Sequence, residues 1–233
     1  MSTTQPSVPN IPSGDLEIAR PRLVVGVCGV GTEVGKTWVT ARVAERLRHA
    51  GFAVSARKPA QSHEPDDVNT DAAILAAATG DAAQAVCPEV RDYAVAMAPP
   101  MAAAYLGLAP FSVADLLAEL HWPRGCDVGF VESAGGVLSP IASDGDTRDL
   151  IRQTDPDLVV LVADAGLGVI NALRLSIAAL APLRPIVLLN RFDDCDELHC
   201  RNLSWLRSVD RLDPVTSPQG LCDLIIGILD RTR

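Results

Sequence analysis

A glycine-rich segment, residues 29–37, constrains what this chain can fold into more than any other stretch. It follows an apolar run at residues 23–28 and precedes a helical pattern, which is the order of strand, loop and helix that a phosphate site needs. Glycines let backbone N–H groups turn toward phosphate oxygens, and the next helix directs its positive end at them. We therefore predict a nucleoside triphosphate site, where Lys36 reaches the β and γ phosphates and Thr37 offers its hydroxyl to Mg²⁺.

The spacing of this loop is unusual. Phosphate loops normally have four residues between the first glycine and the glycine before lysine, whereas five residues separate Gly29 from Gly35. A dinucleotide-binding fingerprint does not fit either, because its third glycine would fall at Val34. The acidic residue expected about 20 residues further on is also missing, since the next apolar run leads to Lys58.

Length and charge narrow the class of protein. The chain has 233 residues, which suits one α/β domain, and we expect residues 22–233 to form it after a flexible tail at residues 1–21. The formal net charge of −9 argues against a nucleic-acid partner. The sequence has no apolar run near the ~20 residues of a membrane span. Six cysteines without a Cys-x-x-Cys pair, and no secretory signal, predict reduced thiols and a cytoplasmic location.

Apolar strands alternate with amphipathic helices along the chain. We expect strands at residues 23–28, 52–56, 128–131, 158–162 and 185–189. We expect helices at residues 38–49, 112–120, 198–206 and 220–229, a further helix that starts near residue 71, and another that follows residues 163–171 and ends at about residue 180. This order predicts an α/β fold, a doubly wound and mainly parallel sheet with helices on both faces. Residues 97–104 suit either a pocket for an aliphatic ligand or a tight turn into a helix.

Three charged residues are candidates for the ligand site, two of them at the ends of predicted strands, the edge where ligands of parallel sheets bind. Lys58 follows the second strand and adds a second cation near the phosphates, unless it is an ordinary solvated lysine. Asp71 opens a helix, so it either complements the helix dipole or approaches the metal. Glu132 ends a buried strand, where such enzymes place an acid beside Mg²⁺.

Over most of residues 22–193 the chain resembles the dethiobiotin synthetases, a family with the P-loop NTPase fold. Five motifs carry the resemblance, in chain order: Thr-Glu-Val-Gly-Lys-Thr at 32–37, Lys-Pro-Ala-Gln-Ser at 58–62, Asn-Thr-Asp-Ala at 69–72, Val-Glu-Ser-Ala-Gly-Gly at 131–136 and Leu-Gly-Val-Ile-Asn at 167–171. The family's loop has the same five-residue insert.

The resemblance implies an ATP- and Mg²⁺-dependent ligase of biotin biosynthesis. Such an enzyme closes the ureido ring of dethiobiotin from 7,8-diaminononanoate and CO₂ through a phosphorylated carbamate. Lys58 would be the catalytic residue, and Thr37, Asp71 and Glu132 would hold Mg²⁺. The implied nucleotide-binding residues are Thr32, Glu33, Val34, Gly35, Lys36, Thr37, Trp38, Asp71, Glu132, Ser133, Ala134, Gly135 and Asn190. The implied substrate-binding residues are Ser62 and, from the second subunit of a homodimer, Gly168, Val169, Ile170 and Asn171.

Departures from the family pattern keep other readings open. Val30, Gly31, Gln61, His63 and Ser133 differ from it, although none removes a charge that the chemistry needs. One alternative is a ParA/MinD-like nucleotide switch, whose extra lysine near the loop start is missing here. Another is a related P-loop amidoligase or a non-catalytic relative with a changed substrate. The run at 190–193 also resembles the guanine signature of GTPases. GTP therefore competes with ATP as the nucleotide, unless Asp193 and Asp194 simply begin a polar loop, which is the favoured interpretation.

Overall fold

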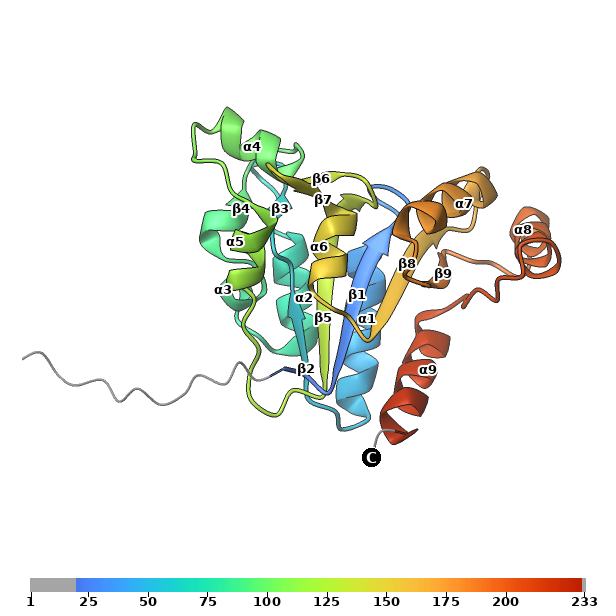
Figure 1. Ribbon diagram of the computed structural model, residues 1–233. Helices are drawn as coiled ribbons and strands as arrows, with labels where there is room; N and C mark the ends of the chain where they lie inside the picture. The colour runs from blue at the N-terminus through green and yellow to red at the C-terminus, as the bar shows by residue number, and fades with distance from the viewer. Residues whose placement is uncertain (1–19, 232–233) are drawn as a thin grey trace, which may run out of the picture.

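The computed structural model describes residues 20–231, so the predicted tail at residues 1–21 lies almost wholly outside the described residues. Its centre is a five-stranded sheet in the order β2-β5-β1-β8-β9, in which every neighbouring pair is parallel. The strands are β1 (Leu23–Gly29), β2 (Val54–Arg57), β5 (Val128–Gly136), β8 (Leu158–Asp164) and β9 (Ile186–Asn190). Because β1 lies in the middle, the glycine loop leaves the sheet at its centre (Figure 1).

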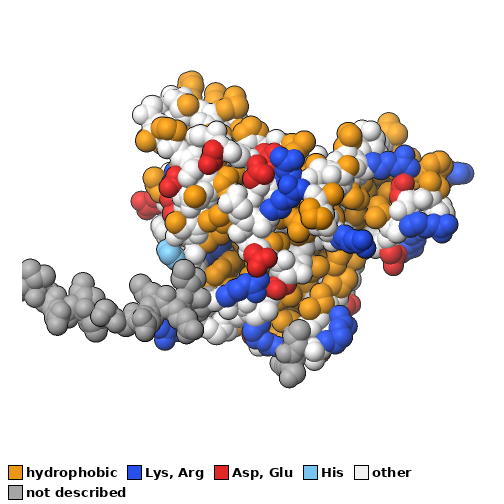
Figure 2. All heavy atoms as spheres, in the orientation of Figure 1, with side chains coloured by type: hydrophobic (Ala, Val, Ile, Leu, Met, Phe, Trp, Pro, Cys, Tyr) orange, Lys and Arg blue, Asp and Glu red, His pale blue; other side chains and the backbone are white. Residues whose placement is uncertain are grey.

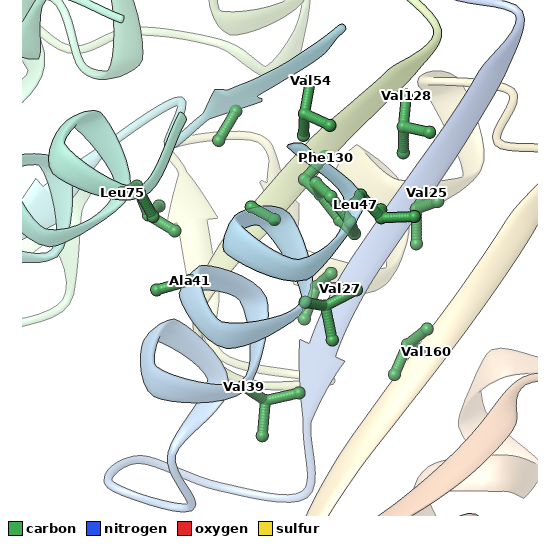
Figure 3. Close-up of a cluster of buried hydrophobic side chains, with 14 of the residues drawn as sticks. Val25, Val27, Val39, Ala41, Leu47, Val54, Leu75, Val128, Phe130 and Val160 are labelled. Atoms are coloured by element: carbon green, nitrogen blue, oxygen red, sulfur yellow. The ribbon is translucent and has the colours of Figure 1, made fainter. Parts of the chain in front are cut away.

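Helices cover both faces of this sheet, as predicted. The helices on one face are α1 (Lys36–His49), α2 (Asp71–Thr79) and α9 (Pro218–Arg231), and their side chains share a core with Val25, Val27 and Phe130 (Figure 3). The helices on the other face are α6 (Thr147–Gln153), α7 (Val169–Leu180) and α8 (Glu197–Ser208), which pack on Cys28 and Leu161. The alternation along β1 explains the two cores, because successive side chains of a strand point to opposite faces.

Shorter elements fill the connections between strands. They are β3 (Gln61–Ser62), α3 (Ala83–Val86), the 3₁₀ helix η1 (Glu89–Arg91), β4 (Asp92–Tyr93), α4 (Pro99–Tyr105), α5 (Val113–Ala118), β6 (Pro140–Ala142) and β7 (Gly145–Asp146). Tyr93, Phe111 and Leu116 pack here in a third, smaller core. The helix α4 leaves Met101 and Tyr105 exposed, and hydrophobic side chains gather on this end of the molecule (Figure 2).

The structure corrects three of the expected boundaries. The strand expected at 128–131 continues to Gly136, because Gly136 pairs with Gly29 after a shift of register between the two strands. The second strand is Val54–Arg57 and not residues 52–56. Gln61 and Ser62, expected in a loop, pair in parallel with Asp92 and Tyr93.

Most of the segment at residues 97–104 belongs to the helix α4, Pro99–Tyr105. Of its two interpretations, the turn into a helix is therefore the one that the structure supports. The helix α4 begins with Pro99 and Pro100, since proline is tolerated in the first turn, where its missing N–H has no intrahelical partner. Within the described residues, no helix combines the length and the apolar character needed to cross a membrane.

Candidate active site

The backbone of the glycine loop has a positive φ at two residues, Gly35 and Glu33. Gly35, at the start of α1, has a φ of 89°, in the left-handed region that glycine tolerates best. A side chain there would run into the amide of Asn190. Glu33 also has a positive φ, 59°, and its carbonyl is held from outside the loop. Val34, by contrast, is buried and packs in the core beside α1. The side chain of Val34 therefore fixes this long loop to the hydrophobic core.

Residues at the ends of β8 and β9 hold this loop. Asn190 is buried and donates a hydrogen bond from Nδ2 to the carbonyl of Val34 at 2.9 Å. Arg191 donates to the carbonyl of Glu33 at 3.0 Å and to Asp164 Oδ2 at 2.6 Å. The ion pair with Arg191 keeps the pKa of Asp164 below its ordinary value, although burial acts in the opposite direction. The side chain of Asn190 thus contacts the backbone of the predicted loop.

The three predicted metal ligands meet at the start of α1. Thr37 Oγ1 lies 2.6 Å from Asp71 Oδ1 and 2.6 Å from Glu132 Oε1. A hydroxyl carries one proton and donates to one of these oxygens, so the other close contact lacks a proton. A hydroxyl and two carboxylate oxygens are the hard ligands that Mg²⁺ prefers, and a cation would relieve their crowding. The residues present therefore fit a magnesium ion.

Lys58 reaches the same cluster from the end of β2. Its Nζ lies 2.6 Å from Asp71 Oδ2, and it donates to Glu132 Oε1 at 2.9 Å and to the carbonyl of Ser133 at 3.2 Å. Burial alone lowers the pKa of Lys58, but the charges of Glu132 and Asp71 outweigh it and leave the pKa above its ordinary value. Lys58 is 2% exposed, which excludes the alternative that it is an ordinary solvated lysine.

Lys36 is the second cation of the site. Its Nζ donates to the carbonyl of Gly31 at 3.1 Å, across the mouth of the loop. Burial and the nearby charge of Lys58 lower the pKa of Lys36 to about 8. Two lysines face two carboxylates here, so the site is balanced before a ligand adds its own charges.

Other predicted site residues occupy the same edge of the sheet. Ser133, Ala134 and Gly135 belong to the last part of β5, and the hydroxyl of Ser133 is buried without a hydrogen-bond partner among residues 20–231. Thr32 lies in the loop, and Trp38, on the outside of α1, is 49% exposed.

The predicted substrate residues lie on two separate elements. Ser62 forms part of β3, four positions after Lys58. Gly168 has a φ of 90° and caps the N-terminus of α7, whose first residues are Val169, Ile170 and Asn171. Leu167, just before them, is 92% exposed.

Two contributors to the site had not been predicted as site residues. Thr40 lies one turn after Thr37, and its hydroxyl is 2.8 Å from Glu132 Oε2. The helical spacing of the two threonines was the available signal. Arg191 offered no comparable signal, because its contact with Glu33 joins residues 158 positions apart.

Asp193, the residue that would read guanine, has a local role. Its Oδ1 accepts a hydrogen bond from the backbone of Cys195 at 2.9 Å, as the aspartate of a polar turn does. This contact matches the interpretation of 193–194 as the start of a polar loop.

Comparisons with known proteins agree with this geometry. A family model described as an AAA domain matches residues 24–194. An ATP-dependent dethiobiotin synthetase BioD of Rhodococcus jostii is 38% identical over 160 residues, covering 68% of both chains. The protein of the same name in Rhodopirellula baltica is 35% identical over 219 residues, covering 83% of this chain and 84% of the relative.

Among solved structures, the signal recognition particle receptor FtsY of Elizabethkingia anophelis aligns with a TM-score of 0.50 and 17% identity, over 86% of this chain and 60% of the receptor. This likeness concerns the fold alone, a parallel sheet with a nucleotide loop at its centre. Sequence identity, the match of the family model and the five motifs show together that the chain belongs to the dethiobiotin synthetase family of P-loop NTPases.

Proposed function

We propose that this protein is an ATP-dependent dethiobiotin synthetase, a ligase of biotin biosynthesis. The relatives of that name support the activity. The observation that carries the proposal is the buried Lys58, which is bound to Asp71 and Glu132 beside the loop that carries Lys36 and Thr37. This arrangement places two lysine side chains where two anionic substrates must meet.

The proposed reaction has three steps. One amine of 7,8-diaminononanoate adds to CO₂ and loses a proton, which gives a carbamate. A carbamate oxygen then attacks the γ phosphorus of ATP, and ADP leaves with the electron pair of the broken bond. The second amine attacks the carbamoyl carbon and loses a proton, inorganic phosphate leaves with the electron pair of the broken C–O bond, and the ureido ring closes.

The residues divide this work between them. Lys36 binds the β and γ phosphates, and Lys58 neutralises the carbamate and the transferring phosphoryl group. Thr37, Asp71 and Glu132 hold Mg²⁺, which when bound lowers the negative charge of the phosphates. Ser62 orients the diamine, because it follows Lys58 on the same short segment.

The nucleotide occupies the loop and the carboxyl ends of β5 and β9. The residues proposed to contact it are Thr32, Glu33, Val34, Gly35, Lys36, Thr37, Trp38, Asp71, Glu132, Ser133, Ala134, Gly135 and Asn190. We favour ATP over GTP, since Asp193 is engaged in its own turn. The cytoplasm, where thiols stay reduced, suits the six free cysteines.

A homodimer would complete the substrate site. Gly168, Val169, Ile170 and Asn171 would bind the carboxylate tail of the diamine held by the other subunit, since the N-terminus of α7 favours an anion. The adjacent Leu167 is 92% exposed, so a second copy bound at this place would bury its apolar side chain.

Phosphate release measured with and without its co-substrates tests the proposal. We expect release from ATP to require both 7,8-diaminononanoate and bicarbonate, and dethiobiotin to appear in equal amount by mass spectrometry. Each nucleoside triphosphate is tested in turn. Release that does not depend on the diamine would contradict the ligase and favour a nucleotide switch.

A further inference from the structure

The ammonium group of Lys58 has no proton left for a substrate. An ammonium carries three N–H bonds, and Lys58 lies within 3.2 Å of three acceptors: Asp71 Oδ2, Glu132 Oε1 and the carbonyl of Ser133. In this arrangement Lys58 is satisfied by protein groups alone. It must break at least one of these contacts before it can neutralise a carbamate.

Two of those acceptors belong to the carboxylates that fit Mg²⁺. Glu132 Oε1 lies 2.9 Å from Lys58 Nζ and 2.6 Å from the hydroxyl of Thr37. Asp71 contacts Lys58 with one oxygen and Thr37 with the other. A lysine ammonium therefore takes the same carboxylate charge that a divalent cation would need.

Two cations cannot share these oxygens at low cost. The pair of carboxylates carries two negative charges, which Lys58 and Lys36 already balance, and an added dication would face Lys58 across the same oxygen of a buried carboxylate. Repulsion at such separations is strong where water is excluded. Entry of the dication and departure of the ammonium are thus linked.

We propose that Lys58 is a displaceable occupant of the metal site. The cation that arrives with the nucleotide takes over Asp71 and Glu132, and this exchange frees the Lys58 ammonium for the anionic co-substrate. Asp71 provides the route for the exchange, because its side chain is 41% exposed whereas that of Glu132 is fully buried. The last step rests on the function proposed above; the exchange itself does not.

The exchange makes metal binding depend on the nucleotide. Without nucleotide, the tethered ammonium competes with the dication, so the affinity for metal alone is low. Phosphate oxygens supply further ligands and negative charge, which tip the competition toward the metal. The device keeps Lys58 inactive until the metal and the triphosphate are both in place.

Nucleotide-free binding of Mn²⁺, followed by electron paramagnetic resonance, tests the exchange without any measurement of turnover. Lys58→Met removes the competing ammonium and retains its apolar stem. We expect Lys58→Met to bind Mn²⁺ at least about tenfold more tightly than the wild type, because the competing charge is gone. Equal affinity in the two proteins would overturn the proposal.

Lys36→Met is the matched control, because it removes a positive charge from the same site without vacating the carboxylate pair. Because the Nζ of Lys36 is bonded to the carbonyl of Gly31, we expect this control to raise the affinity for Mn²⁺ through its charge alone, and by at least about threefold less than Lys58→Met does. A gain as large as that of Lys58→Met would show that net charge alone governs binding, and the exchange would be refuted.

A second measurement covers the case in which Lys58→Met does not fold. The crystal structure of the wild-type protein with Mn²⁺ and a non-hydrolysable ATP analogue should show Lys58 Nζ beyond hydrogen-bonding distance of at least one of the two carboxylates. An ammonium still bound to both, with the metal present, would overturn the exchange. Neither result depends on whether the diamine is the substrate, so failure of the proposed function would be seen separately.

Discussion

At the scale of single residues, the carboxylate of Glu132 shows how the site is built. Glu132 is fully buried, so each of its oxygens needs a donor. Oε1 is close to Thr37 and Lys58, and Oε2 lies 2.8 Å from the hydroxyl of Thr40. The same hydroxyl is 2.9 Å from the carbonyl of Lys36, but a carboxylate is the stronger acceptor. Thr40 therefore fixes the orientation of Glu132.

Thr40→Val tests this positioning role. Valine keeps the shape of the side chain and leaves Glu132 Oε2 without a donor, so we expect the affinity for Mn²⁺ in the presence of an ATP analogue to fall by about 10- to 100-fold. We expect kcat to fall with it, while the KM for the diamine changes little. Thr40→Ser, which retains the hydroxyl, should restore both values. A serine variant as impaired as the valine variant would indicate a packing role instead.

His63, beside Ser62, has a geometry that requires a charged ring. Its Nδ1 lies 2.8 Å from the carbonyl of Glu64 and its Nε2 lies 2.8 Å from Asp92 Oδ1, so both nitrogens face acceptors and both must donate. Burial lowers the pKa of His63, but the hydrogen bonds to Glu64 and Asp92 outweigh it and raise the pKa above its ordinary value of 6.5.

The raised pKa predicts how stability depends on pH. A folded-state pKa above the unfolded value stabilises the protein fully below pH 6.5, and this contribution is lost as the pH rises through the folded-state pKa. We expect wild-type protein to melt about 1–3 °C above His63→Gln at pH 5.5, and the difference to be smaller at pH 9. Thermal melts at both pH values check this. A constant difference would mean that the ring is not charged.

At the scale of elements, the glycine loop depends on strands remote from it in sequence. Asn190 and Arg191, at the end of β9, hold the carbonyls of Val34 and Glu33. The side chain of Asn190 also fills the space next to Gly35. The loop is thus clamped between β1 and β9, and its shape depends on the correct packing of the whole sheet.

Gly35→Ala tests the clamp. The substitution places a methyl group against Asn190 at a φ of 89°, which is strained for any side chain. We expect the melting temperature of the nucleotide-free protein to fall by about 4–8 °C, which corresponds to about 2 kcal/mol. Gly31→Ala is the control, since a Cβ there meets no atom of the described part of the chain within 4 Å. Equal melting temperatures for the two variants would contradict the clamp.

At the scale of the whole molecule, two exposed apolar regions lie at the end where the strands point. One is the helix α4, where Met101 and Tyr105 are exposed, and the other is Leu167, which precedes α7. Figure 1 shows the helices α4 and α7 at this end of the sheet. Exposed apolar patches mark protein contacts more often than isolated apolar residues do. Contact with a second copy would cover Leu167 and bring residues 168–171 to the other subunit.

Leu167→Asp tests the dimer, because a charge in an apolar interface must be desolvated. We expect sedimentation to show a monomer at micromolar concentration, and the KM for the diamine to rise by about tenfold or more while the affinity for ATP stays the same. Val90→Asp, at another exposed apolar residue, serves as the control and should remain dimeric. A monomeric wild-type protein, or a dimeric Leu167→Asp with an unchanged KM, would count against the assembly.

The sequence alone determined the class of fold and the members of the central cluster. Apolar runs and helical periods are local properties, and parallel strands bring their carboxyl ends to one edge. Lys58, Asp71 and Glu132 were therefore expected near Thr37, and the structure brings all four together. The five-residue spacing of the loop and four further motifs indicated the family before any coordinates.

The pairing of those residues depends on the fold of the whole chain. The contact of Thr40 with Glu132 spans 92 positions, and that of Asn190 with Val34 spans 156. The extension of β5 to Gly136 depends on its pairing with β1, and Gln61 and Ser62 form a strand only because Asp92 and Tyr93 lie beside them. Hydrogen bonds are directional over about 3 Å, so packing of distant segments, and not local pattern, selects each partner. For that reason the sequence identified Lys58, and only the fold showed that all three of its protons are already bound.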